Sequence, residues 1–120
     1  DIFPMKQIKW SNFPFLIETK TGYEEYTPTL TKYSKVLQWF NKSIIESKVH
    51  GQWIIFLICQ FKNQSALLFT NYQLDLDKII PVSIIPNQIN GEIQWINVYL
   101  FKEIIKLNFI DLFGSEITYR

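Results

Sequence analysis

The feature that most constrains this chain is an apolar run in its middle, within residues 52–61. Seven consecutive residues, 53–59, are all apolar and are rich in isoleucine and aromatic side chains. A strand has this composition when both faces of its sheet are covered, whereas a half-exposed strand alternates apolar and polar residues. The run is also far too short to span a bilayer. We therefore predict that residues 52–61 form a central strand of a sheet covered on both faces.

A long helix is predicted just before this strand. Apolar residues recur at helical spacing from Leu30 to Ile45, and the opposite face is polar. Thr27 is a suitable N-cap and Pro28 suits the first helical position. Gly51 suits the position just after the helix C-terminus, where glycine is favoured.

The remaining elements follow from alternation and turn residues. Residues 5–10 and 13–17 are predicted to form a β-hairpin, with the second strand ending at residues 18–20 and broken by Thr21-Gly22. Residues 65–70 are expected to form a short strand antiparallel to the central one. A further strand at residues 78–85, interrupted by Pro81 and stopped by Pro86, leads through an Asn90-Gly91 turn to a strand at 92–99. An amphipathic helix is expected over residues 101–112.

Composition indicates one domain, residues 1–120, with a packed core. Apolar residues make up 48% of the chain and the net charge is only +1, so charge alone does not point to a polyanion partner. The start lacks methionine and has no signal-peptide layout, so we expect an intracellular fragment of a longer chain. Cys59 is the only cysteine, which excludes an internal disulfide. Eleven of the twelve cations are lysines, so phosphate contacts would come from lysines rather than guanidinium groups.

The tripeptide Glu18-Thr19-Lys20 ends an apolar strand and precedes the long helix and the buried strand. Here the chain resembles the PD-(D/E)XK nuclease superfamily, with Asp1 as the upstream acid. Residues 50–61 followed by 66–69 also look like the Gly-led strand pair of small microbial Holliday-junction resolvases. The resemblance covers about residues 1–80. A second Glu-x-Lys, Glu46-Ser47-Lys48, lies at the end of the predicted helix and is interpreted as solvated surface.

The resemblance implies an α+β, restriction-endonuclease-like core with a central mixed sheet, one long helix after a β-hairpin and a C-terminal helix. It implies a Mg²⁺- or Mn²⁺-dependent endonuclease acting on duplex or branched DNA, as a homodimer or within a larger assembly and not at a membrane. Phosphodiester cleavage requires a cation that neutralises charge on phosphate oxygens, and Mg²⁺ prefers carboxylate oxygens and water. Asp1, Glu18 and the Thr19 carbonyl are the expected ligands. Glu18 and Lys20, two apart on a strand, share one face, so Lys20 is expected to orient the attacking water while Thr19 points away.

The alternative is a non-catalytic interaction module, either a degenerate nuclease fold or an OB-like barrel that binds through aromatic residues. The barrel requires that residues 29–48 do not form one long helix. Other candidate residues have ordinary structural interpretations: His50 at a helix C-terminus favours the helix dipole. Three lysines are interpreted as part of a solvated helix face: Lys32, Lys35 and Lys42. Four aromatic residues are expected in the core: Trp39, Phe40, Trp53 and Trp95.

Overall fold

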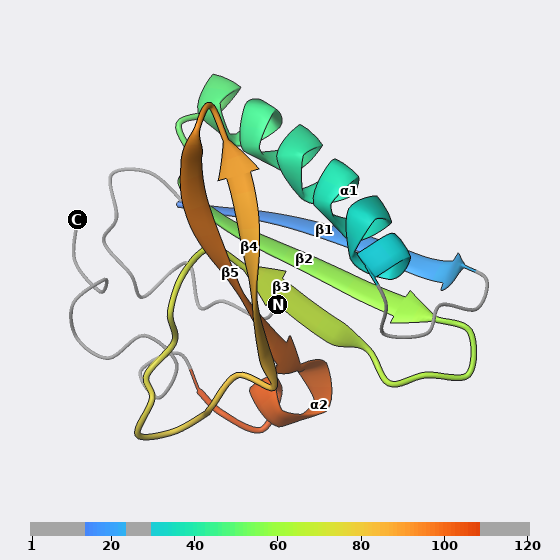
Figure 1. Cartoon of the computed structure of the whole chain (residues 1–120). Coiled ribbons are helices and arrows are strands. Elements are labelled where there is room, and N and C mark those ends of the chain that lie inside the picture. The colour runs from blue at the N-terminus through green and yellow to red at the C-terminus, as the bar shows by residue number, and fades with distance from the viewer. Residues whose placement is uncertain (1–13, 24–29, 109–120) are drawn as a thin grey trace.

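The computed structural model describes residues 14–23 and 30–108. These residues form an α+β fold in which a long helix lies across one face of a mixed sheet and a short helix follows the last strand (Figure 1). In chain order the elements are β1 (Phe15–Tyr23), α1 (Leu30–Val49), β2 (Ile54–Phe61), β3 (Leu67–Thr70), β4 (Ser83–Ile89), β5 (Glu92–Leu100) and α2 (Phe101–Ile104).

The sheet order within the described residues is β1-β2-β3-β5-β4. Strands β1 and β2 are parallel and are joined by α1, and the other three neighbouring pairs are antiparallel. The predicted antiparallel pairing of β2 with β3 is confirmed. Strand β2 is interior and covered on both faces, as predicted, although the middle position of the sheet belongs to β3.

Two hydrophobic clusters lie on opposite faces of the sheet because successive side chains of a strand point to opposite sides. On the α1 face, Val36, Trp39 and Phe40 of the helix pack over alternate residues of β2, including Leu57 and Cys59. On the other face a second cluster forms around β2 and β5 and is covered by the segment after β3 and by α2. Its buried members are Phe15, Ile54, Phe56, Ile58, Leu68, Leu74, Ile79, Tyr99 and Ile104.

The predicted long helix is confirmed as α1, and Gly51 follows it with a φ of +69°, the left-handed conformation that suits glycine. Because α1 is one continuous helix of 20 residues, the OB-like barrel alternative is wrong. The turn prediction at Asn90-Gly91 is also confirmed, since both residues have positive φ and join β4 to β5. The described residues contain no helix long and apolar enough to cross a membrane.

Strand β4 differs from its predicted bounds. Residues 78–79 lie in a turn in which the Asp75 carbonyl accepts hydrogen bonds from the Lys78 and Ile79 N–H groups, each at 3.0 Å, and the strand begins only at Ser83. The strand also continues through Pro86, which pairs with Trp95. Proline is tolerated there because β4 is an edge strand among the described strands, where a missing N–H need not break the sheet ladder.

Two aromatic residues expected in the core are exposed. Trp53 precedes the first residue of β2 and is 41% exposed, and Trp95 is 54% exposed. The β4–β5 hairpin runs past the end of β3 (Figure 1). Trp95 lies on this part of β5 and points away from α1, so among the described strands only β4 lies beside it. The prediction is confirmed for Trp39 and Phe40, which are buried.

The C-terminal helix is shorter than predicted. α2 has four residues, and the chain then tightens into a turn in which the Leu107 N–H donates to the Ile104 carbonyl at 3.1 Å. Three predicted features lie outside the described residues: the strand at 5–10, the Thr27-Pro28 cap and the part of the last helix after residue 108.

Candidate functional site

Glu18 and Lys20 lie inside β1 rather than at its end. The strand continues to Tyr23 through a register shift between Thr21 and Tyr23, so the prediction that Thr21-Gly22 breaks the strand is wrong. A local irregularity such as a β-bulge shifts the register of a strand without ending it, so the pairing continues past the glycine.

The two side chains share one face, as predicted. Glu18 pairs with Leu57 and Lys20 with Cys59 in the parallel register, and both partners belong to the cluster under α1. Glu18 and Lys20 therefore point toward the helix-covered face, where both are partly exposed. Thr19 points to the other face and is exposed.

Lys20 lies against the indole of Trp39 on α1. Its Nζ is 5.6 Å from the ring centroid, and the Nζ of Lys35, one helical turn before Trp39, is 5.7 Å from the same centroid. Both distances fall within the roughly 6 Å over which an aromatic ring attracts a cation. The indole is held in turn by Phe61 of β2, with the two ring centroids 6.4 Å apart and the planes nearly parallel. The ammonium groups of Lys20 on β1 and Lys35 on α1 thus both lie over the Trp39 ring, which is packed against Phe61.

Neither lysine forms an ion pair with a carboxylate among residues 14–23 and 30–108. The ion pair described there joins Lys106 to Glu103, with Nζ and Oε2 3.4 Å apart, and it lies elsewhere in the fold. Glu18 likewise makes no described hydrogen bond or ion pair, so its carboxylate is available to a ligand. A metal site would need further acids: the described residues hold no group of three or more His, Cys, Asp or Glu side chains, and Asp1 lies outside them.

The second Glu-x-Lys has the surface character that was predicted for it. Glu46 and Lys48 are exposed on α1, and Ser47 between them is buried with its Oγ donating to the Ile44 carbonyl at 2.7 Å. His50 is exposed just after the helix. Lys35 and Lys42 are exposed on α1, whereas the Lys32 side chain lies outside the described part of the molecule.

A cluster of amides under α1 was not predicted. The Asn87 Nδ2 of β4 donates to the Asn41 Oδ1 of α1 at 2.8 Å, and Asn87 is almost fully buried. Gln94 stands opposite Asn87 on β5, and its Oε1 is buried with no hydrogen-bond partner in the described structure. Only the order of the strands brings Asn41 of α1 over β4, so no local sequence pattern indicates this contact.

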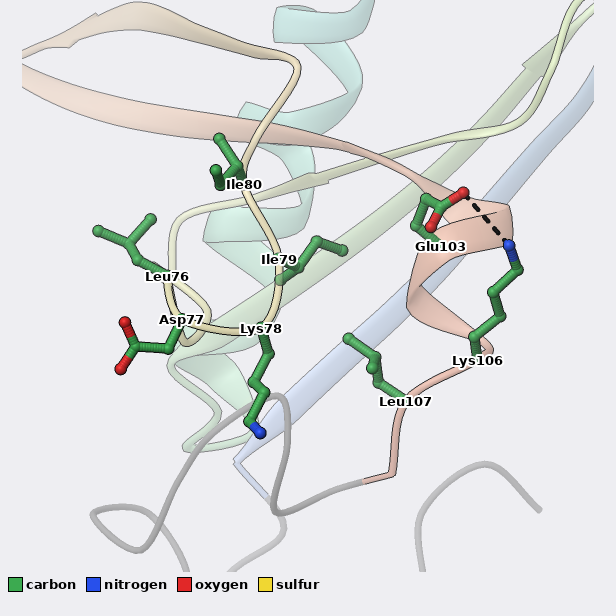
Figure 2. Close-up of a pocket in the computed structure, with 8 residues that line it drawn as sticks. All are labelled: Leu76, Asp77, Lys78, Ile79, Ile80, Glu103, Lys106 and Leu107. Carbon is green, nitrogen blue, oxygen red and sulfur yellow. Dashed lines mark hydrogen bonds and ion pairs between the residues drawn. The ribbon is translucent and has the colours of Figure 1, made fainter.

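A groove of about 390 Å³ on the opposite side of the sheet was not predicted either. It lies between the turn that precedes β4 and the end of α2, and Figure 2 shows Ile79 and Leu107 inside it, with Lys106 paired to Glu103 at its rim. Its walls combine residues about 30 positions apart in the chain. Its lining residues are Leu76, Asp77, Lys78, Ile79, Ile80, Glu103, Lys106 and Leu107.

No protein-family model, curated protein or solved structure matches this chain. What the molecule does must therefore be argued from the placement of its own residues.

Proposed function

We propose that this chain is an intracellular, metal-dependent DNA endonuclease domain with a restriction-endonuclease-like core. The observation that supports the proposal is the shared orientation of Glu18 and Lys20 on β1. The strand opens a β1–α1–β2 unit with parallel strands, so an acid and an amine project together from one strand beside the helix. This is the order of acid, amine, helix and buried strand on which the nuclease prediction was based.

The proposed metal ligands are the Glu18 carboxylate, the Thr19 carbonyl and Asp1. Glu18 fits this role because it is partly exposed and has no described partner that would compete for its oxygens. Mg²⁺ is usually held by one or two carboxylates together with water and substrate phosphates, so Asp1 is proposed to supply a second carboxylate beside Glu18. When bound, the cation supplies positive charge that stabilises the negative charge developing on the phosphate.

Lys20 is the proposed residue that orients the attacking water. Its ammonium group is directed by the indole face of Trp39, which reduces the number of positions the long lysine side chain can take. A group held in this way delivers its proton donors in a fixed direction, and such positioning is the main contribution that a protein makes to phosphoryl-transfer chemistry.

The two Glu-x-Lys sequences of the chain provide an internally controlled test. Cleavage of plasmid and of branched DNA is measured with Mg²⁺ or Mn²⁺ for the natural chain and for two double variants, one at each Glu-x-Lys. We expect Glu18→Gln with Lys20→Ala to lower the rate by at least about 100-fold, and Glu46→Gln with Lys48→Ala to leave it unchanged. Both variants should retain the circular dichroism spectrum of the natural chain. No metal-dependent cleavage, or equal loss in both variants, would contradict the proposal.

A second candidate function is supported by an exposed apolar surface on the β4–β5 hairpin. Ile84, Ile93 and Trp95 are each more than half exposed on the side of the hairpin that faces away from α1. Apolar residues that gather on one exposed face often mark a contact surface for another macromolecule. Under this alternative the chain is a non-catalytic interaction module, and substitution of Trp95 by serine, not of Glu18, would abolish its activity in a binding assay.

A further inference from the structure

We infer that Lys35, together with Lys20 and the indole of Trp39, binds a backbone phosphate of DNA next to Glu18. The inference rests on the proposed function and deepens it, because it assigns a substrate contact to α1 that the Glu-x-Lys tripeptide does not contain. Lys20 and Lys35, which both lie over the Trp39 ring, are called the lysine pair below.

The first argument is electrostatic. Two ammonium groups lie within 6 Å of one ring centroid, and neither forms an ion pair with a carboxylate among the described residues. The two ammonium groups carry like charges that repel each other, and an anion bound between them would offset this repulsion. A phosphate is such an anion, and lysine binds it as a point charge without the planar geometry that arginine requires.

The second argument is the position of the lysine pair in the fold. Lys20 lies in the C-terminal half of β1, and Lys35 lies in the second turn of α1, the helix that follows this strand. The first turn of α1 contains no acidic residue, so the positive end of the helix dipole adds to the two lysines.

The third argument is proximity to the proposed chemistry. Glu18 and Lys20 project to the same face of β1, and Trp39 is fixed against Phe61 on the neighbouring strand. A phosphate held by the lysine pair would therefore lie on the face of β1 from which Glu18 also projects. Lys35 would act as a binding residue for the backbone, independent of base sequence.

The experiment measures the salt dependence of DNA binding in EDTA, where the metal-dependent reaction does not proceed. A fluorescent duplex is titrated with the natural chain, with Lys35→Gln and with Lys48→Gln between 50 and 200 mM salt. Lys48 is the matched control because it is an exposed lysine of the same helix, about 20 Å further along its axis. Each phosphate contact contributes about 0.9 to the slope of log affinity against log salt.

We expect Lys35→Gln to lower the magnitude of this slope by about 0.9. The ratio of the natural to the variant affinity should then fall about 3.5-fold between 50 and 200 mM salt. Lys48→Gln should keep the natural slope. A merely structural role of Lys35 would change the affinity without changing the slope, so an unchanged slope, or an equal change in Lys48→Gln, would overturn the inference.

Cleavage measured separately with Mg²⁺ distinguishes this inference from the proposed function. If the natural chain cleaves DNA but Lys35→Gln keeps the natural slope, the phosphate contact is wrong and the endonuclease proposal stands. If Lys35→Gln lowers the slope but the natural chain does not cleave, the phosphate contact stands and the endonuclease proposal is wrong. If the natural chain neither binds DNA in EDTA nor cleaves it with Mg²⁺, both are wrong.

Discussion

Replacing Tyr99 by phenylalanine tests whether a single buried hydrogen bond holds the loop after β3 onto the sheet. Tyr99 is fully buried in β5, and its hydroxyl oxygen accepts a hydrogen bond from the Leu74 N–H at 3.1 Å. Leu74 is itself 1% exposed, so water cannot replace the lost acceptor. A buried N–H left without a partner costs about 1–3 kcal/mol, while the aromatic ring and its packing are unchanged. We therefore expect the free energy of unfolding to fall by about 1–3 kcal/mol.

The same substitution should alter how stability depends on pH. Burial raises the pKa of the Tyr99 hydroxyl, an effect opposed by the hydrogen bond from Leu74. Above the ordinary tyrosine pKa of about 10, an unfolded chain releases this proton while the folded chain keeps it, so this contribution to stability is complete below pH 10 and is lost as the pH rises through the folded pKa. The advantage of the natural chain over Tyr99→Phe should therefore shrink above pH 10.

Urea unfolding followed by circular dichroism at pH 8 and pH 10.5 measures both effects. The comparison between the two chains cancels the other tyrosines, which titrate in both. Equal stability of the two chains at pH 8 would show that the Leu74 hydrogen bond contributes nothing. A stability difference that stays constant between the two pH values would refute the argument from burial.

Two further predictions test the assignment of buried and exposed positions and the end of α1. Leu57→Ala, in the cluster under α1, should lower the free energy of unfolding by about 2–5 kcal/mol, whereas Ile93→Ala on the exposed hairpin face should change it by less than about 0.5 kcal/mol. Similar losses for the two variants in urea unfolding would contradict the assignment of Leu57 as buried and Ile93 as exposed. Gly51→Ala should lower the free energy of unfolding by about 1 kcal/mol because the residue has a φ of +69°, which alanine adopts only with strain. The added methyl would meet no neighbour within 4 Å, so a steric clash is not the cause. An unchanged urea midpoint would disprove this explanation.

The parts of the fold that could be predicted from the sequence are those set by local patterns. The helical spacing of Leu30 to Ile45 defines α1, and the continuous apolar run defines β2. The Asn90-Gly91 turn is equally local, since both residues must adopt positive φ. Each of these signals is contained within fewer than about 25 consecutive residues, so no knowledge of distant partners was needed.

The parts that could not be predicted depend on which strands become neighbours. From the sequence, Pro86 predicts the end of a strand, and only the position of β4 at an edge of the described sheet shows that the strand can continue through it. The spacing of Trp95 predicts a core residue, and only the extension of the β4–β5 hairpin beyond β3 explains its exposure. The approach of Lys20 and Lys35 to the same Trp39 ring depends on how α1 crosses β1, which no local pattern encodes. The tripeptide could be found in the sequence, but the charges around it could not.

The position of Glu18 and Lys20 on β1 also has a purely structural explanation, which makes different predictions from the catalytic one. Among the described strands β1 is an edge, and charged side chains on an edge strand discourage pairing with other molecules. If this were their only role, Glu18→Gln with Lys20→Ala would increase self-association without affecting DNA. That role does not account for Lys35, because Lys35 is on α1 and cannot protect a strand edge. The convergence of a helix lysine and a strand lysine on one indole is therefore the feature that favours an anionic ligand over protection of the edge.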